Sequence, residues 1–150
     1  MLTIDQIPHA AANSWPLLVL SGASETHNNG KGAFQEVDAI SLLTPHTKYA
    51  VRPDSAAAIP KSIRDAYRAA WFGRPGPAFV DLPANLILGH HDVERQQLKP
   101  FAEVPLSVAP ANKIRDVVAA FKSAKAPLVV IGKGAAYARA EKQINALIER

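Results

Sequence analysis

The feature that most constrains the fold is a set of short, uniformly apolar runs separated by segments with helical periodicity. One such run, Leu-Leu-Val-Leu at residues 17–20, follows Pro16 and ends before Gly22. A strand-length run without polar side chains is typical of a parallel strand that is covered on both faces. We therefore expect residues 17–20 to form a central strand, and the alternation along the chain predicts an α/β fold with a parallel sheet.

Two further strands and a helix are expected in the first half of the chain. Residues 48–51 and 78–80 are the candidate strands. Apolar side chains recur at three- or four-residue spacing over residues 34–43, which predicts a helix that ends before Pro45.

A longer helix is predicted over residues 59–71, where apolar side chains share one stripe. Ser55 is the expected cap at its start, and Pro60 lies in the first turns, where a missing N–H costs least. Gly73 is the expected stop signal.

The periodicity lapses over residues 85–110, which are rich in proline and polar side chains and are interpreted as an interdomain linker. Beyond it, the pattern predicts a helix over residues 114–121, a buried strand over 127–131 and a helix over 137–148. That remainder has about 40 residues, near the lower limit for independent folding, and we interpret it as the start of a further domain.

Composition excludes several classes of protein. Apolar residues make up 48% of the chain, which excludes a disordered tail, and a net charge of +4 is scattered, so nucleic acid is not the expected partner. The apolar runs are too short for a membrane span, and residues 1–9 lack the pattern of a secretory signal. The absence of cysteine excludes disulfides and thiolate chemistry.

The loop that follows the first strand is one candidate site, since ligands of open α/β sheets bind at the carboxyl ends of the strands. It leads into Gly-Ala-Phe-Gln-Glu at residues 32–36. Gln35, at the expected helix start, is a neutral donor and acceptor that could orient a polar ligand. A solvated connection is the alternative interpretation.

A second candidate is the turn Gly132-Lys133-Gly134 after the expected strand. It resembles a dinucleotide-binding loop, although Tyr137 occupies the place of the third glycine, so dinucleotide redox chemistry is not expected. An anion could bind at the start of the helix with Lys133 as an added charge. A tight strand-to-helix turn is the alternative.

Two further groups have structural alternatives. Arg74 could bind a phosphate or carboxylate, or it could pair with Asp81 across the turn. His90, His91 and Asp92 are metal-ligand types, but adjacent histidines point in different directions and no distant third ligand is evident. No metal site is expected from them.

Four stretches carry a family resemblance. They are residues 14–22, residues 31–36 with Lys-Gly-Ala-Phe-Gln-Glu, residues 73–84 beginning Gly-Arg-Pro-Gly-Pro, and residues 127–138. Together they are similar to the thiamine diphosphate-dependent enzymes, and the last stretch resembles the branch of 2-hydroxyacyl-CoA lyases and oxalyl-CoA decarboxylases. Phe34-Gln35 favours the lyase, since the decarboxylases tend to carry Tyr-Glu there.

The resemblance implies enzymes of three α/β domains. Residues 1–84 would be the second half of the parallel-sheet pyrimidine-binding domain, residues 85–110 a linker, and residues 111–150 the start of a Rossmann-like central domain. The family's catalytic glutamate and its Gly-Asp-Gly motif, which holds Mg²⁺ and the diphosphate, have no counterpart in this chain.

The resemblance also implies roles for individual residues. Gln35 corresponds to the active-site glutamine beside the reactive thiazolium, and Phe34 lines the same pocket. The positions that match the vicinity of an ADP or CoA nucleotide are Lys133, Arg74, Gly132 and Gly134.

The implied reaction is the thiamine diphosphate- and Mg²⁺-dependent cleavage of a 2-hydroxyacyl-CoA, an acyl-CoA substrate, into an aldehyde and formyl-CoA, as in fatty-acid α-oxidation. The family suggests a homodimer or homotetramer, in the peroxisome or cytoplasm, without a nucleic-acid or membrane partner. The chain alone is expected to be inactive. Alternatives are an oxalyl-CoA decarboxylase, an acetolactate synthase-like enzyme, or a non-catalytic interaction fragment.

Overall fold

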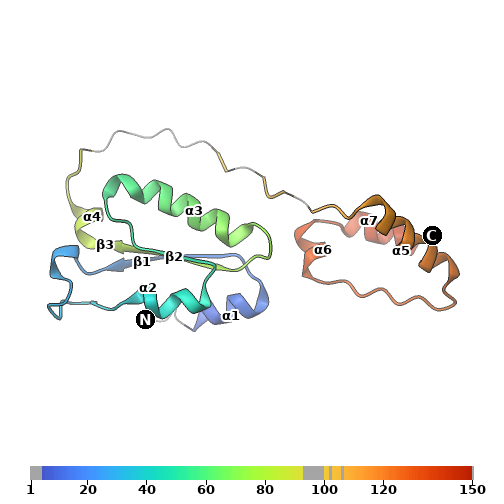
Figure 1. Ribbon diagram of the computed structural model, residues 1–150, viewed down its shortest axis with the longest axis horizontal. Coiled ribbons are helices and arrows are strands. Elements are labelled where there is room, and N and C mark those ends of the chain that lie inside the picture. The colour runs from blue at the N-terminus through green and yellow to red at the C-terminus, as the bar shows by residue number, and fades with distance from the viewer. Residues whose placement is uncertain (1–4, 93–99, 102, 106, 150) are drawn as a thin grey trace. The chain divides into compact units, whose positions relative to one another are not determined.

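The computed structural model describes residues 5–92, 100–101, 103–105 and 107–149. The chain forms two compact units, Met1–Val104 and Pro105–Arg150, and each is described by itself (Figure 1). The expected assignment of the chain to family domains, with a linker over residues 85–110, stays a prediction.

In the part of the first unit that the structure describes, three strands form a parallel sheet. They are β1 (Leu17–Ala23), β2 (Tyr49–Val51) and β3 (Pro77–Pro83), in the spatial order β1-β3-β2. Both β1 and β2 pair with β3 in parallel. The predicted α/β class is therefore confirmed, and all three predicted strands of this unit form.

The prediction that residues 17–20 form the central strand is wrong. The central strand is β3, which is buried along almost its whole length, whereas β1 lies at an edge and Leu20 is 50% exposed. Apolar composition is similar in the two strands, and their order depends on long-range pairing that local sequence does not encode.

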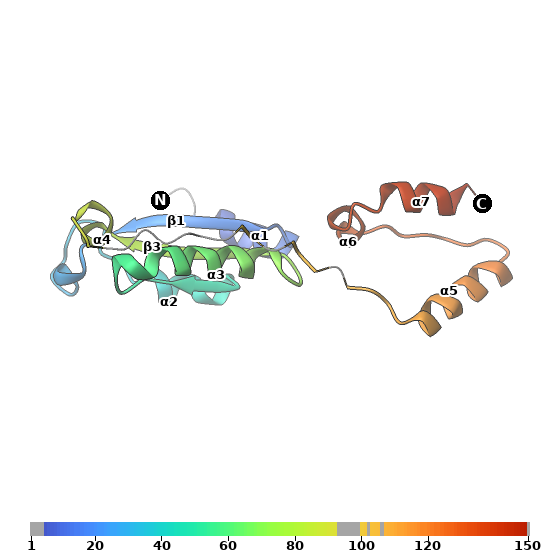
Figure 2. The ribbon, with the colours of Figure 1, turned by 90° about the horizontal axis from the view of Figure 1, so that it is seen from above.

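Helices cover both faces of this sheet. Helix α3 (Ile59–Trp71) lies along β3 on one face, and α1 (Gln6–Asn13) and α2 (Ala39–Leu43) pack on the other (Figures 1 and 2). Phe79 packs among side chains of α1 and α2, whereas its neighbour Val80 packs against Ala66 and Ala70 of α3. Successive residues of a strand point to opposite faces, so β3 supplies both cores.

The observed ends of α3 agree with two of the three start and stop signals predicted for it. Pro60 lies in the first turn and Gly73 follows the helix with a φ of 68°, so both predictions are confirmed. Ser55 is not its cap: it precedes a separate short helix, η3 (Ala56–Ala58), and its side chain makes no capping hydrogen bond. The remaining short elements are η1 (Thr26–Asn28), η2 (Thr44–His46) and α4 (Ala84–Leu88).

The described residues of the second unit form three helices, α5 (Ala111–Ser123), α6 (Lys133–Tyr137) and α7 (Glu141–Ile148). The helix predicted over residues 114–121 is confirmed, while the one predicted from residue 137 begins at Glu141. The strand predicted over residues 127–131 is wrong: Leu128 and Val130 are each 86% exposed, and nothing in the described part of this unit pairs with them. A strand needs a partner to satisfy its backbone groups, and apolar composition alone does not provide one.

Candidate functional site

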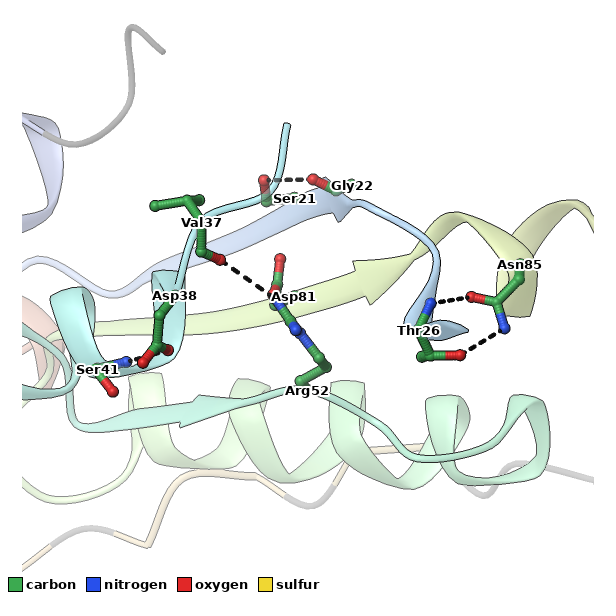
Figure 3. Close-up of polar contacts among 9 residues, drawn as sticks. All are labelled: Ser21, Gly22, Thr26, Val37, Asp38, Ser41, Arg52, Asp81 and Asn85. Atoms are coloured by element: carbon green, nitrogen blue, oxygen red, sulfur yellow. Dashed lines mark hydrogen bonds and ion pairs between the residues drawn. The ribbon is translucent and has the colours of Figure 1, made fainter. Parts of the chain in front are cut away.

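The carboxyl ends of β1 and β3 meet at one edge of the sheet, where the loop of residues 24–38 follows β1 (Figure 3). Thr26 in this loop is joined to Asn85, which lies just after β3. The backbone N–H of Thr26 donates to Oδ1 of Asn85, and Nδ2 of Asn85 donates to Oγ1 of Thr26, each at 3.0 Å. The pair joins the segments that leave two neighbouring strands, at the edge where α/β sheets bind ligands.

Glu36 organises the middle of this loop. Its two carboxylate oxygens accept hydrogen bonds from the backbone N–H groups of Gly30 and Ala33. These bonds, with that from Gly30 the largest effect, hold the pKa of the Glu36 carboxyl below its ordinary value. Backbone amides that converge on one anion form a nest, and here the chain supplies its own carboxylate as the occupant.

Phe34 and Gln35 lie at the tip of a turn over residues 33–36, which the N–H of Glu36 closes by donating to the carbonyl of Ala33 at 3.0 Å. Phe34 is 87% exposed, and Gln35 is also exposed, with a φ of 62°. The structure therefore brings these two predicted site residues together, at the carboxyl edge of the sheet. Their catalytic roles stay predictions.

Gln35 does not lie at a helix start, so the helix predicted over residues 34–43 is wrong in its first half. Helix α2 begins at Ala39, because Asp38 is its N-cap and accepts a hydrogen bond from the backbone N–H of Ser41 at 3.1 Å. The hydrogen bonds from Ser41 also lower the pKa of Asp38. An aspartate directly before an apolar helical segment is an ordinary N-cap signal, and it could have placed this boundary.

Arg52 and Asp81 form a buried ion pair beside the loop (Figure 3). Nε of Arg52 donates to Oδ2 of Asp81 at 2.7 Å, and the Asp81 side chain is only 3% exposed. Nη2 of Arg52 also reaches the carbonyl oxygen of Val37 at 3.5 Å, so the pair connects β3 to the loop.

Sequence reasoning missed this pair. The available signal was an acidic residue inside an apolar strand, Asp81, together with a basic residue directly after a neighbouring strand, Arg52. Because parallel strands end at the same edge, opposite charges at two strand ends are expected to meet. The predicted alternative pairing of Asp81 with Arg74 is wrong, since Arg52 already occupies that carboxylate.

Arg74 lies at the opposite, amino edge of the sheet, in the turn before β3. Its Nε donates to Oγ of Ser14 at 2.7 Å. With His46 and Lys48 it contributes to the lining of an open pocket of about 370 Å³. Lys48 donates from Nζ to the carbonyl of Phe72 at 2.7 Å, and burial lowers its pKa. The structure thus separates Arg74 from the loop that carries Gln35.

Gly132, Lys133 and Gly134 lie in the second unit. Gly132 precedes α6 with extended backbone, and Lys133 and Gly134 form the first turn of that five-residue helix. All three residues are exposed. The turn predicted at this place is present without the paired strand expected before it, and nucleotide binding there stays a prediction.

His91 contacts the backbone rather than a metal constellation: its Nε2 lies 3.0 Å from the carbonyl oxygen of Asn85. Among the described residues, no cluster of three or more His, Asp or Glu side chains could hold a metal ion. Within that same part of the chain, no helix is both long and apolar enough to cross a membrane.

Over most of its length, the chain is similar to parts of longer known proteins. No family model matches it. It is 38% identical over 143 residues to 2-hydroxyacyl-CoA lyase 1 of Homo sapiens, covering 95% of this chain and 25% of that protein. It is 29% identical to a probable acetolactate synthase large subunit of Methanococcus aeolicus, covering 93% of this chain and 24% of that protein.

A third relative, oxalyl-CoA decarboxylase of Escherichia coli, is 27% identical over 149 residues, covering 95% of this chain and 26% of that protein. The chain thus spans about a quarter of the length of the curated relatives that it matches. The resemblance predicted from the four motifs is confirmed. The chain is a partial relative of the 2-hydroxyacyl-CoA lyase and oxalyl-CoA decarboxylase branch of the thiamine diphosphate-dependent enzymes.

Proposed function

We propose that this chain is part of a thiamine diphosphate-dependent 2-hydroxyacyl-CoA lyase, which cleaves the C1–C2 bond of a 2-hydroxyacyl-CoA to give an aldehyde and formyl-CoA. The observation that carries the proposal is the 38% identity to human 2-hydroxyacyl-CoA lyase 1 over 95% of the chain. The proposal extends to an acyl-CoA substrate, a homodimeric or homotetrameric assembly, and a setting in peroxisomal fatty-acid α-oxidation.

The described residues of this chain can contact the reactive end of thiamine diphosphate, but they are not suited to hold its diphosphate end. Gln35 offers an exposed amide and Phe34 an exposed aromatic ring, both on one turn. The diphosphate end needs Mg²⁺, and the described residues contain no cluster of acidic or imidazole ligands for it. Of the contacts with thiamine diphosphate, we therefore assign to this chain only those around the reactive centre, and we leave the Mg²⁺–diphosphate anchor to other residues.

Gln35 would act as a neutral positioning group. When bound, thiamine diphosphate supplies an electron sink for the carbon whose bond to C1 breaks. The Gln35 amide can donate to a substrate carbonyl oxygen or accept from its hydroxyl without a change in charge. Phe34, on the same turn, would cover the apolar part of the pocket. In the second unit, Lys133 and the Gly132–Gly134 turn at the start of α6 are proposed contacts of the CoA nucleotide. Arg74 is a separate proposed contact in the first unit.

A chimera tests the proposal. This chain would replace the matching 143 residues of human 2-hydroxyacyl-CoA lyase 1, and formyl-CoA and aldehyde would be measured. We expect activity, and we expect Gln35→Ala to lower turnover more than cofactor affinity. A chimera that folds and binds thiamine diphosphate but releases no formyl-CoA would contradict the proposal. Release of carbon dioxide from oxalyl-CoA instead would favour the decarboxylase, and formation of acetolactate the synthase-like alternative.

A second candidate function is a non-catalytic fragment that docks on a full-length relative. The observation in its favour is that, among the described residues, no strand pairs with the side of β1 that faces away from β3, and that Leu20 of this strand is half exposed. An unpaired strand edge is a template for another chain. Size-exclusion chromatography of the chain, with and without the human lyase, would test it. A stable monomer that does not co-elute with the lyase would count against docking.

A further inference from the structure

The loop that carries Phe34 and Gln35 is built around one side chain. Both oxygens of the Glu36 carboxylate accept hydrogen bonds from loop amides, one from Gly30 and one, at 3.0 Å, from Ala33. The backbone N–H of Glu36 in turn donates to the carbonyl of Ala33. Ala33 and Glu36 are therefore linked twice, through the backbone and through the side chain, and only Phe34 and Gln35 lie between them.

Gln35 has a backbone conformation that needs such support. Its φ of 62° lies in the left-handed region, which residues other than glycine rarely adopt. It occupies the third position of the turn over residues 33–36, where a turn that needs positive φ usually has glycine or asparagine. A residue in a sparsely populated conformation persists only when its surroundings fix it, and such residues cluster at functional sites.

A second anchor lies on the other side of Glu36. The carbonyl oxygen of Val37 receives the contact from Arg52, which is itself held by buried Asp81 (Figure 3). The turn is thus tied to its own preceding residues by Glu36 and to the sheet beyond it by Arg52. The hydrogen bonds of Glu36 act directly on the turn, whereas the contact of Arg52 with Val37 acts on the segment that follows the turn.

We propose that Glu36 is a positioning residue: its carboxylate, seated on the amides of Gly30 and Ala33, fixes the turn that presents Gln35 and Phe34 at the carboxyl edge of the sheet. This inference rests on the proposed function for the importance of Gln35, but the positioning itself is a property of this chain. Glu36 need not touch the substrate.

The chemistry of the two contacts distinguishes a carboxylate from its closest substitute. Both partners are N–H donors, so both positions require an acceptor, and a carboxylate offers two. A glutamine has the same size but places an NH₂ group at one of the two positions, where donor would face donor. Glu36→Gln therefore removes one of the two contacts and takes the charge from the other, with little change in volume.

The first experiment uses the 150-residue chain and backbone amide exchange measured by NMR. We expect Glu36→Gln to accelerate exchange at Gly30 and Ala33 by about tenfold or more, as loss of hydrogen bonds to a charged group implies. Glu103→Gln, the same chemical change at an exposed site, should leave these amides unchanged. Unaltered exchange at Gly30 and Ala33 in the folded Glu36→Gln protein would overturn the proposal.

The second experiment uses the active chimera described above. We expect Glu36→Gln to lower kcat as Gln35→Ala does, with KM and cofactor affinity nearly unchanged, while Glu103→Gln keeps full activity. If the unsubstituted chimera is inactive, the proposed function fails while the exchange result still decides the positioning role. If Gln35→Ala lowers kcat but Glu36→Gln does not, the positioning role alone is overturned.

Discussion

Arg52 and Asp81 are 29 residues apart in sequence, yet the guanidinium of one donates to the carboxylate of the other at 2.7 Å. The pair lies where the chain leaves β2 and where β3 approaches its end, beside the loop that carries Gln35. Asp81 is almost completely buried, and an acidic residue in such a place needs a partner. The ion pair therefore couples the stability of the sheet to the geometry of the candidate site.

Removing that buried charge should destabilise the first unit. Asp81→Asn leaves the Arg52 guanidinium without its anionic partner, and we expect the free energy of unfolding to fall by about 2 kcal/mol. Arg52 is 25% exposed, so water compensates part of the loss. Urea unfolding followed by circular dichroism measures the change. As a control, Asp65→Asn, which breaks the exposed pair with Lys61, should cost less than about 0.5 kcal/mol.

Replacing a buried and an exposed phenylalanine by alanine should have very different effects on stability. Phe79 is buried in the centre of the sheet, and Phe79→Ala should lower the free energy of unfolding by about 3 to 5 kcal/mol, enough to unfold many domains. Phe34 is exposed, and Phe34→Ala should change stability by less than about 0.5 kcal/mol. The same unfolding measurement checks both. A large loss of stability in Phe34→Ala would mean that its ring has a structural role.

The loop should loosen in acid. The pKa of Glu36 is lowered on folding, chiefly by the N–H of Gly30, so its contribution is fully present above the ordinary value of 4.5. It is lost as the pH falls through the lower pKa of the folded protein. NMR titration of the Gly30 amide reports the midpoint, which should lie below 4.5 and disappear in Glu36→Gln. A midpoint at or above 4.5 would contradict the nest.

The pKa of Asp38 is also lowered, chiefly by the hydrogen bonds from Ser41. The titrations of the two carboxyls can be distinguished because each affects a different backbone amide signal. The Ser41 amide should follow Asp38 and be unaffected by Glu36→Gln, whereas the Gly30 amide should lose its pH dependence in that variant.

The isolated chain should not bind thiamine diphosphate in a saturable way, even with Mg²⁺ added. Among its described residues there is no cluster to hold the metal, and a turn that carries one amide and one ring provides too few contacts for tight binding. Isothermal titration calorimetry on the purified chain checks this. Saturable binding would show that the chain holds more of the cofactor site than we assign to it.

Several features of the fold could be predicted from the sequence because they depend on neighbours along the chain. The three parallel strands of the first unit, the end of α3 before Gly73 and the helix α5 each follow from runs or stripes of a few residues. The position of the candidate turn could also be predicted, whereas the roles of its residues stay predictions. Gln35 and Phe34 were placed after a parallel strand, and they are exposed there.

The fold class, the family branch and the residues of the candidate turn follow from the sequence, because apolar runs, turn residues and motifs are local properties. The tertiary structure decided that β3 rather than β1 is central, that Asp81 pairs with Arg52 rather than Arg74, and that residues 127–131 have no strand partner among those described. Each of these depends on which distant segment lies alongside. Local preferences are compatible with several such pairings, and long-range packing selects one.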